Sequence, residues 1–344
     1  MSKRVKIIHT GGTFGMMISE GEQTVRQPEG LLQEILNQVP ELRKIADLSL
    51  DILCNLDSSD VEPFHWKNLA QKILEAWEEA DGFVVIHGTD TMTYTASALA
   101  FFLSGLTKSI VFTGSQRPLR ELRNDARANI IDAIELATFG LPEVLICFDS
   151  EVHRATRATK FSSQHMHAFA SPNFLILGAF GVNFRAEKAF IKTVIAPEMR
   201  HKPVIDTRIE SRIICLDCIP GINFSAALIE HIVTGCQGIV LKGYGAGNLP
   251  IAPDTPWQKI CEAAAFKEIP VVMTTQCPSG SVNLNAYENG RVFQALGVIS
   301  GMDMTLEALS VKLMVMLGRK VPYAERFEFF KIPLADECSR FDFS

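Results

Sequence analysis

The chain has 344 residues, which corresponds to about two domains of ordinary size. Lys and Arg total 33 against 39 for Asp and Glu, so the formal net charge is −6, and there is no basic stripe. A phosphate-binding surface for nucleic acid is therefore not expected. The apolar run around Ala96–Leu103 is too short to cross a bilayer, and the N-terminal apolar run is shorter than a signal-peptide core. We expect a cytoplasmic protein with no membrane and no nucleic-acid partner.

Short apolar runs alternate with helical patterns, which predicts an α/β fold with a largely parallel sheet. In the N-terminal part the expected strands are Val5–Ile8, Leu48–Leu53, Phe83–Ile86, Ile110–Thr113 and Val144–Phe148. The expected helices are Gly30–Val39, Pro63–Glu79, Tyr94–Leu103 and Asp125–Thr138. We expect this part, residues 1–186, to be the larger of two α/β domains, with a mostly parallel sheet and helices on both faces.

The region Glu187–Arg212 differs, because it carries prolines and several charges without a clear period. We interpret residues 187–212 as an interdomain linker. Beyond it the alternation resumes and predicts a smaller parallel α/β domain at residues 213–344. Its expected strands are Ile213–Leu216, Gly238–Leu241 and Pro270–Thr274, and its expected helices are Phe224–Val233, Pro256–Phe266 and Thr305–Leu317.

The eight cysteines are scattered, and most lie inside apolar runs. Without a secretory signal, we expect them to be reduced and mostly buried. Cys215 and Cys218 form a lone CxxC within a predicted strand, with no second pair and no nearby His. His165 and His167 likewise lack further clustered ligands, so no metal site is expected.

Two glycine-rich turns carry the clearest chemical signal. TGGT at residues 10–13 and HGTDT at residues 87–91 each follow a short apolar strand. Glycines allow a sharp turn and bring backbone N–H groups close to a substrate oxygen. A threonine at the centre of each turn, with an aspartate in one of them, indicates acyl chemistry more than simple binding.

Polar clusters follow four consecutive predicted strands, and the carboxyl ends of parallel strands share the ligand-binding edge of a sheet. The clusters are Thr10–Thr13, Asp57–Asp60, His87–Thr91 and Gly114–Arg117. Their hydroxyls include Ser58, Ser59, Thr89 and Ser115, and their carboxylates include Asp57 and Asp90. This set of groups suits a small zwitterionic ligand with a reactive acyl group.

Taken together, these motifs resemble the bacterial-type L-asparaginases, and most closely their cytoplasmic type I branch. The resemblance covers nearly the whole chain, and its first and third motifs are the two family signatures. The motifs are TGGTFG (10–15), DSSD (57–60), GFVVIHGTDTMTYTASAL (82–99), TGSQRPL (113–119), RATRATK (154–160), FASPN (169–173), GYGAGN (243–248), TTQCPSG (274–280) and GMDMTLEALSVKL (301–313).

The resemblance implies an amidohydrolase that converts L-asparagine to L-aspartate and ammonia. Thr13 matches the nucleophile that forms a β-aspartyl ester, and Thr89, Asp90 and Lys160 match the catalytic group beside it. A Thr hydroxyl needs a neighbouring base or cation at neutral pH, which a lysine ammonium would supply. Asp90 also matches the ligand of the substrate α-ammonium.

The resemblance also assigns substrate contacts and partners. Asp57 and Ser58 match contacts to the α-ammonium and α-carboxylate, and Ser59, Thr89 and Ser115 complete the expected substrate-binding set. The family uses no metal and no organic cofactor. It assembles as dimers that often pair into tetramers, so a homodimer or homotetramer is expected here.

One departure from the family concerns the lid after the first motif. The family usually has a lid tyrosine that helps to activate the nucleophile, but residues 14–30 contain none. The tyrosines of this chain are Tyr94, Tyr244, Tyr287 and Tyr323, and Phe14 replaces the usual Ile or Val. The group that activates Thr13 is left open.

Alternatives remain for single residues and for the whole chain. Judged alone, Thr10, Thr13 and Asp90 are also typical helix caps, and Lys160 a solvated lysine. The asparaginase-like subunit of tRNA-dependent amidotransferases shares the motifs, although TGGT at residue 10 leaves no room for its additional N-terminal domain. A non-catalytic amino-acid sensor of the same fold is the third alternative.

A regulatory site is a further expectation from the resemblance. Some type I members bind a second asparagine away from the catalytic centre, and the matching positions are Thr159, Lys242 and Cys277. The family's regulatory arginine is replaced by Lys242, which cannot form the same forked contact with a carboxylate.

Overall fold

The computed structural model describes residues 2–19, 22–25, 30–188, 192, 199, 201–252 and 255–339. Its internal contacts divide the chain into Met1–Thr207, here called unit 1, and Arg208–Ser344, here called unit 2. The expected linker 187–212 lies partly outside the described residues. Near its end, β14 (Val204–Ile205) pairs antiparallel with β6 (Leu103–Ser104), so this stretch is joined to unit 1.

Unit 1 is built on a sheet with the strand order β13-β12-β9-β8-β7-β5-β1-β4. The five strands from β8 to β4 run parallel, and β9, β12 and β13 add antiparallel neighbours. The sheet strands are β1 (Arg4–Gly11), β4 (Asp47–Leu56), β5 (Gly82–Ile86), β7 (Ile110–Thr113), β8 (Val144–Phe148), β9 (Glu151–Arg154), β12 (Gly178–Ala179) and β13 (Arg185–Ala186). The predicted mostly parallel sheet is thus confirmed, and all five predicted strands are found.

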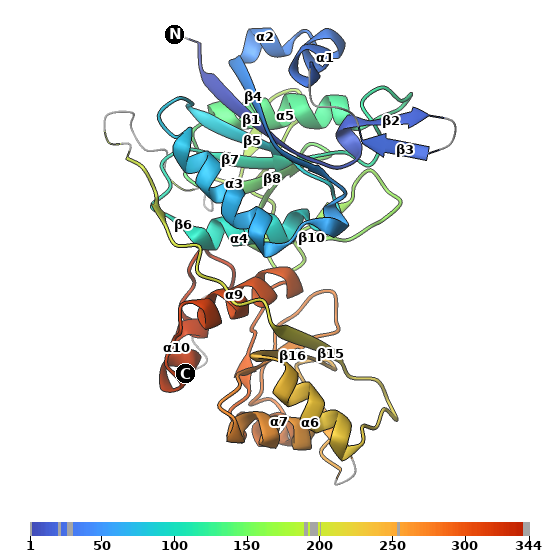
Figure 1. Cartoon of the computed structure of the whole chain (residues 1–344), viewed down its shortest axis with the longest axis vertical. Helices are drawn as coiled ribbons and strands as arrows, with labels where there is room; N and C mark the ends of the chain where they lie inside the picture. The colour runs from blue at the N-terminus through green and yellow to red at the C-terminus, as the bar shows by residue number, and fades with distance from the viewer. Residues whose placement is uncertain are drawn as a thin grey trace. The chain divides into compact units, whose positions relative to one another are not determined.

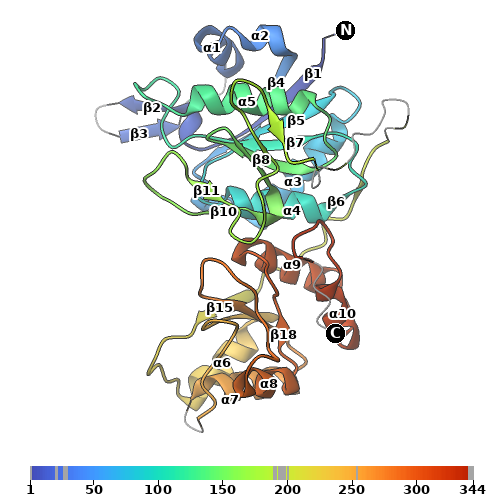
Figure 2. The ribbon, with the colours of Figure 1, turned by 180° about the vertical axis from the view of Figure 1, so that it is seen from behind.

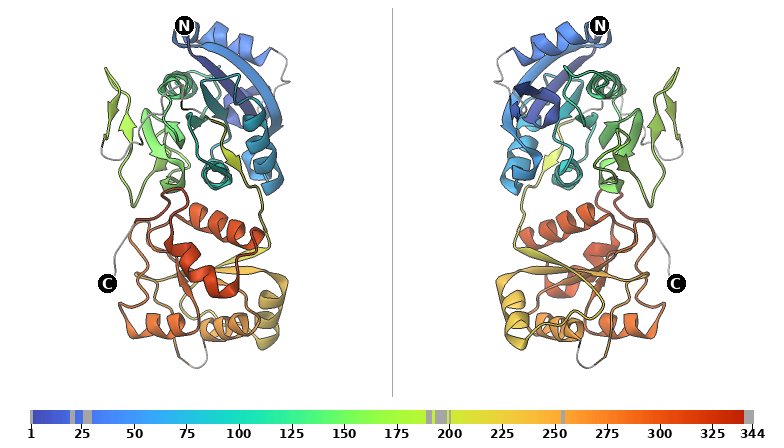
Figure 3. Two further views of the ribbon diagram at one scale, coloured as in Figure 1. Left: turned by 90° about the vertical axis from the view of Figure 1, so that its left-hand side faces the viewer. Right: turned by 90° about the vertical axis from the view of Figure 1, so that its right-hand side faces the viewer.

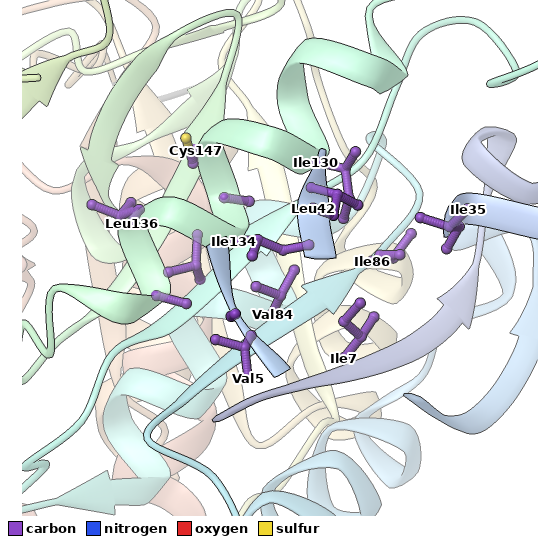
Figure 4. Close-up of a cluster of buried hydrophobic side chains, with 14 of the residues drawn as sticks. Val5, Ile7, Ile35, Leu42, Val84, Ile86, Ile130, Ile134, Leu136 and Cys147 are labelled. Atoms are coloured by element: carbon purple, nitrogen blue, oxygen red, sulfur yellow. The ribbon is translucent and has the colours of Figure 1, made fainter. Parts of the chain in front are cut away.

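Helices cover both faces of this sheet, as Figures 1 and 2 show. They are α1 (Leu31–Gln38), α2 (Leu42–Ile45), α3 (Pro63–Glu75), α4 (Met92–Phe102) and α5 (Ala126–Thr138). Alternate strand residues point to opposite faces, so Val84 and Ile86 of β5 pack in one core with α1, α2 and α5 (Figure 4). On the other face, Phe83 stacks on Trp77, which follows α3, at 5.4 Å between ring centroids.

Several short elements of unit 1 were not predicted. Besides α2, β6, β9 and β12–β14, they include the hairpin of β2 (Met16–Ser19) and β3 (Glu22–Val25), the hairpin of β10 (Thr159–Lys160) and β11 (Phe169–Ala170), and 3-10 turns at Thr13–Gly15, Ser58–Asp60 and Ala155–Arg157. Strand β1 also extends past the predicted end at Ile8, so Thr10 lies inside the strand. Its hydroxyl donates to the carbonyl of Ile86 at 3.0 Å, which excludes a helix-cap role.

Unit 2 is a second, smaller α/β unit with a four-stranded parallel sheet, in agreement with the prediction (Figure 3). Its strands are β15 (Ile213–Asp217), β16 (Gly238–Gly243), β17 (Val271–Thr275) and β18 (Ile299–Ser300). Its helices are α6 (Ala226–Gly235), α7 (Pro256–Phe266), α8 (Glu288–Ala295), α9 (Leu306–Gly318) and α10 (Arg326–Lys331), with a 3-10 turn at Tyr323–Glu325. Helices α6, α7 and α8 share one core, whereas α9 and α10 pack on the opposite face of the sheet.

Within the described ranges, no helix is both long and apolar enough to cross a membrane.

Candidate active site

The two signature turns abut at the carboxyl ends of β1 and β5. A Cβ placed on Gly12 would lie 2.4 Å from the Cα of Gly88, so only glycine fits on this side of the contact. Gly12 also has a φ of 83°, which a glycine adopts without strain. A Cβ on Gly88 would lie 2.7 Å from the Cβ and the Oγ of Ser58, which follows β4. The glycines therefore bring the ends of three neighbouring strands into close contact.

Lys160, Thr89 and Asp90 form one hydrogen-bonded group. The Nζ of Lys160 donates to Thr89 Oγ1 at 2.8 Å and to Asp90 Oδ1 at 2.5 Å. The lysine side chain is 16% exposed and that of Asp90 is 65% exposed, so the group reaches from the protein interior to the surface. Lys160 lies on β10 and is paired with Phe169 of β11. The ring of Phe169 packs against the ring of Phe148. The structure thus brings together three of the residues predicted to be catalytic.

Gln116 is the next member of this network, and sequence reasoning did not single it out. Its Nε2 donates to the carbonyl of His165 at 3.2 Å, and its Oε1 accepts from the Thr89 hydroxyl at 3.0 Å. A backbone carbonyl only accepts, so the amide orientation of Gln116 is fixed by His165. The Thr89 proton then points to Gln116, which leaves the Thr89 lone pairs for Lys160.

Asp57, Ser58 and Ser59 lie at the end of β4, where Ser58 begins a 3-10 turn. Asp57 Oδ1 accepts from the backbone N–H and the hydroxyl of Ser59, each at 2.8 Å. These two bonds hold the pKa of the Asp57 carboxyl below its usual value. Ser58 is buried, and its Oγ accepts from the N–H of Asp90 at 3.3 Å. The predicted substrate-binding turn is therefore bonded directly to the second signature motif.

Ser115 and His87 are both buried near the same strand ends. The Ser115 Oγ has no hydrogen-bond partner among the described residues, which is uncommon for a buried hydroxyl. His87 bonds through Nδ1 to the carbonyl of Gly88 at 2.7 Å and through Nε2 to the Thr95 hydroxyl at 3.0 Å. Burial lowers the pKa of His87 to about 4, so this ring is neutral at pH 7 and orders the turn.

Thr13 begins the 3-10 turn that directly follows β1 and is half-buried. The Gly12–Gly88 contact brings its backbone to the same corner as Thr89, but the hydrogen bonds of the Lys160 group do not include Thr13. Phe14 is buried in the main core of unit 1. Of the lid segment, residues 20–21 and 26–29 lie outside the described residues.

The predicted regulatory residues fall in both units. Thr159 precedes Lys160 on β10 of unit 1, whereas Lys242 and Cys277 belong to unit 2. Lys242 on β16 is ion-paired with Asp217 at 2.9 Å. Cys277 is exposed, and its N–H donates to Thr275 Oγ1 at 3.0 Å.

A cavity of about 500 Å³ lies elsewhere in unit 1, between α1 and β4, and contains none of the residues above. The chemistry instead centres on the Lys160 group. An ammonium that donates to both a hydroxyl and a carboxylate forms charge-assisted hydrogen bonds, along which protons can pass. This arrangement suits general acid–base assistance to an acyl transfer.

The chain is similar to known proteins over almost its full length. The family model "Asparaginase, N-terminal" matches residues 4–191, and the model "Glutaminase/Asparaginase C-terminal domain" matches residues 212–330. L-asparaginase 1 of Escherichia coli (strain K12) is 36% identical over 324 residues, which are 93% of each chain.

Two further relatives bear on the alternatives. One subunit of the glutamyl-tRNA(Gln) amidotransferase of Pyrococcus abyssi (strain GE5 / Orsay) is 35% identical, over 91% of this chain and 72% of that protein. Among solved structures, the thermostable L-asparaginase from Thermococcus kodakarensis superimposes with a TM-score of 0.88 at 30% identity. That match covers 98% of this chain and 99% of the other.

Proposed function

Because the chain belongs to the asparaginase family, we propose that it hydrolyses the side-chain amide of L-asparagine to give L-aspartate and ammonia. One observation carries this proposal from the site itself. The Lys160 ammonium is bonded to both the Thr89 hydroxyl and the Asp90 carboxylate. We assign the proton transfers of amide hydrolysis to this group, which consists of two residues of the second signature motif and the lysine of RATRATK.

In the proposed reaction, the Oγ of Thr13 attacks the side-chain amide carbon of asparagine. A C–O bond forms, the Thr13 proton passes to the amide nitrogen, and the C–N bond breaks to release ammonia. Water then attacks the resulting β-aspartyl ester, which releases aspartate and restores the Thr13 hydroxyl. Thr89 assists the proton transfers. It is hydrogen-bonded to the Lys160 ammonium, which is in turn bonded to the Asp90 carboxylate.

The proposed substrate contacts lie around this group. The Asp57 and Asp90 carboxylates are assigned to the substrate α-ammonium, and the Ser58 hydroxyl to the α-carboxylate. Two observations support these roles: Asp57 is held in its ionised form, and Ser58 is bonded to the backbone of Asp90. The unpartnered hydroxyl of Ser115 and the exposed turn at Ser59 supply further polar groups at the same edge.

Ammonia release from L-asparagine and from L-glutamine, measured side by side at steady state, tests this proposal. We expect steady-state ammonia release from asparagine, and the same experiment gives the ratio to glutamine, because one methylene is worth only about 1–3 kcal/mol of discrimination. A well-folded chain that released no ammonia from either amide would contradict the proposal and favour the sensor alternative.

The similarity to a glutamyl-tRNA(Gln) amidotransferase favours a second candidate function, in which the chain supplies ammonia to a tRNA-dependent partner. Affinity purification from the native cell distinguishes the two. A stoichiometric tRNA-binding partner, with amide hydrolysis that depends on it, would support this candidate. Full asparaginase activity of the isolated chain would contradict it.

We also propose, from the resemblance to type I asparaginases, a cytoplasmic location, a homodimeric or homotetrameric assembly, and regulation by asparagine, with Thr159 of unit 1 and Lys242 and Cys277 of unit 2 as the candidate regulatory residues. A coupling of about 1–3 kcal/mol between sites would make the rate-versus-asparagine curve sigmoidal. A Hill coefficient of one, unchanged in Cys277→Ala, would contradict the regulatory site.

A further inference from the structure

Asp125 occupies the N-cap position of α5 but does not cap that helix. An aspartate in this position ordinarily accepts from the second or third N–H of its own helix. Here Asp125 Oδ2 accepts instead from the N–H of Gln116 at 2.8 Å, and Oδ1 from the N–H of Arg117 at 3.0 Å. The carboxylate is therefore directed at the loop that follows β7, and the helix end loses the usual cap.

Asn129, one turn further along α5, fixes the same loop from its other end. Its Nδ2 donates to the carbonyl of Gly114 at 3.0 Å and to Asp125 Oδ2 at 3.2 Å. Its Oδ1 accepts from the N–H of Asp149 at 2.9 Å, in the tight turn between β8 and β9. Since Gly114 O only accepts and Asp149 N–H only donates, the amide has a single satisfied orientation.

Both side chains are almost fully buried, Asp125 at 6% and Asn129 at 1% exposure. Burial raises the pKa of the Asp125 carboxyl, and the two backbone N–H groups act against that rise. A buried polar group that loses its hydrogen-bond partner is costly, so these bonds hold the loop in one conformation.

The loop of residues 114–117, held by these bonds, positions Gln116 beside Thr89. The Oε1 of Gln116 accepts the hydrogen bond from the Thr89 hydroxyl, and Ser115 is the preceding residue of the loop. A displacement of about 1 Å in a group that orients a reacting hydroxyl can slow an enzyme by about 10²-fold.

We propose that Asp125 and Asn129 are positioning residues of the reaction: they set the loop 114–117 so that the Gln116 amide orients the Thr89 hydroxyl. The inference rests on the proposed asparaginase activity. Neither residue is among the proposed substrate contacts, so their loss lowers kcat more than it changes KM.

The test compares Asp125→Asn with the wild-type chain. The variant keeps the size of the side chain but places an NH2 group against a backbone N–H, so one of the two bonds is lost. We expect kcat for asparagine to fall about tenfold or more while KM changes less than about threefold. Asp81→Asn is the matched control, because the Asp81 carboxylate likewise accepts from a backbone N–H, that of Arg4 at 2.9 Å, at the opposite, amino ends of the strands.

A double-mutant cycle with Gln116→Leu separates positioning from general stabilisation. If Asp125 acts through Gln116, Asp125→Asn adds less than about twofold to the loss of kcat in the Gln116→Leu background. Additive effects, or a wild-type kcat in Asp125→Asn, would overturn the inference. Asn129→Ala, which leaves Asp125 in place, gives the same comparison if Asp125→Asn does not fold.

The activity of the wild-type chain distinguishes a failure of this inference from a failure of the proposed function. An inactive wild-type chain would overturn the asparaginase proposal and this inference with it. An active wild-type chain with unchanged kcat in both variants would overturn the inference alone.

Discussion

At the scale of single residues, the Thr89 hydroxyl is held between an amide and an ammonium. It donates its one proton to Gln116 and accepts from the Lys160 ammonium at 2.8 Å. An amide oxygen does not take up a proton at neutral pH, so Gln116 orients the hydroxyl and leaves proton transfer to Lys160 and Asp90. An ammonium at hydrogen-bond distance stabilises negative charge that develops on the Thr89 oxygen.

Loss of either signature hydroxyl is expected to stop turnover. Thr13→Ala removes the proposed nucleophile and Thr89→Val removes the group beside Lys160, so each should lower kcat by about 10³-fold or more while the melting temperature changes little. Thr234→Val is the matched control, because Thr234 lies on α6 of unit 2 and its hydroxyl bonds to the backbone of its own helix. A near-wild-type kcat in either variant would refute the role of that threonine.

Lys160 is expected to act on the chemical step. Lys160→Met keeps the length of the side chain but removes the ammonium from Thr89 and Asp90, so kcat should fall by about 10²-fold or more with a small change in KM. Steady-state kinetics on asparagine measure both constants. Lys267→Met, which removes an ion pair with Glu230 in unit 2, should leave both unchanged. A pure rise in KM would make Lys160 a substrate-binding residue instead.

At the scale of elements, the site depends on how closely the ends of β1, β5 and β4 approach one another. Gly88→Ala isolates this feature, because Gly88 has no positive φ and only the added Cβ matters. That Cβ would lie 2.7 Å from Ser58, so Ser58 must move and its bond to the Asp90 N–H is lost.

We therefore expect kcat/KM of Gly88→Ala to fall by about tenfold or more. Kinetics on asparagine provide the measurement. Gly181→Ala is the control, since the nearest atom to its Cβ would be 3.9 Å away. Equal kinetics for the two variants would show that the close approach of the strand ends is not required.

Most of these elements could be predicted from the sequence, because the spacing of apolar residues and the length of each apolar run distinguish strands from helices. All five predicted strands of unit 1 are found, and helices such as Ala126–Thr138 differ from the prediction by one or two residues at an end, although α3 ends at Glu75 and not at the predicted Glu79. Short pairs such as β10–β11 were missed, since two-residue strands have no period to detect. Strand β18 was missed for the same reason, whereas helix α8 contains Gly290, a residue of low helix propensity, in its first turn.

The site was predicted in part for a different reason. Thr89, Asp90 and Lys160 could be assigned because their motifs resemble a known family, and the structure places them in one hydrogen-bonded group. Gln116 and Asp125 were not predicted as site residues, because their hydrogen-bond partners are determined by the tertiary fold. The sequence TGSQRPL did contain Gln116, but nothing in its spacing indicates a bond to Thr89.

At the scale of the whole molecule, acid sensitivity is expected to arise in unit 1. Burial lowers the pKa values of His9, His87 and His153 to about 4, against 6.5 for an unfolded histidine. The unfolded chain therefore binds more protons below pH 6.5, and stability is lost as pH falls from 6.5 towards 4. Each histidine should remove roughly 1–2 kcal/mol of the free energy of unfolding between pH 7 and pH 5.

Urea unfolding of the wild-type chain and of His87→Gln at pH 7 and pH 5 tests this expectation. The difference in unfolding free energy between the two pH values should be smaller in the variant by roughly the contribution of one histidine. Other titrating groups are common to both chains, so the comparison isolates His87. An identical pH dependence in the two chains would show that His87 is not held neutral by burial.

The central claim is that this chain hydrolyses asparagine through an ester on Thr13, and hydroxylamine partitioning tests it most directly. An aspartyl ester is attacked by hydroxylamine as well as by water. We therefore expect β-aspartyl hydroxamate to form at the expense of aspartate while the rate of ammonia release does not fall, and both products to disappear in Thr13→Ala. Ammonia release without hydroxamate, or either product from Thr13→Ala at the wild-type rate, would contradict the account.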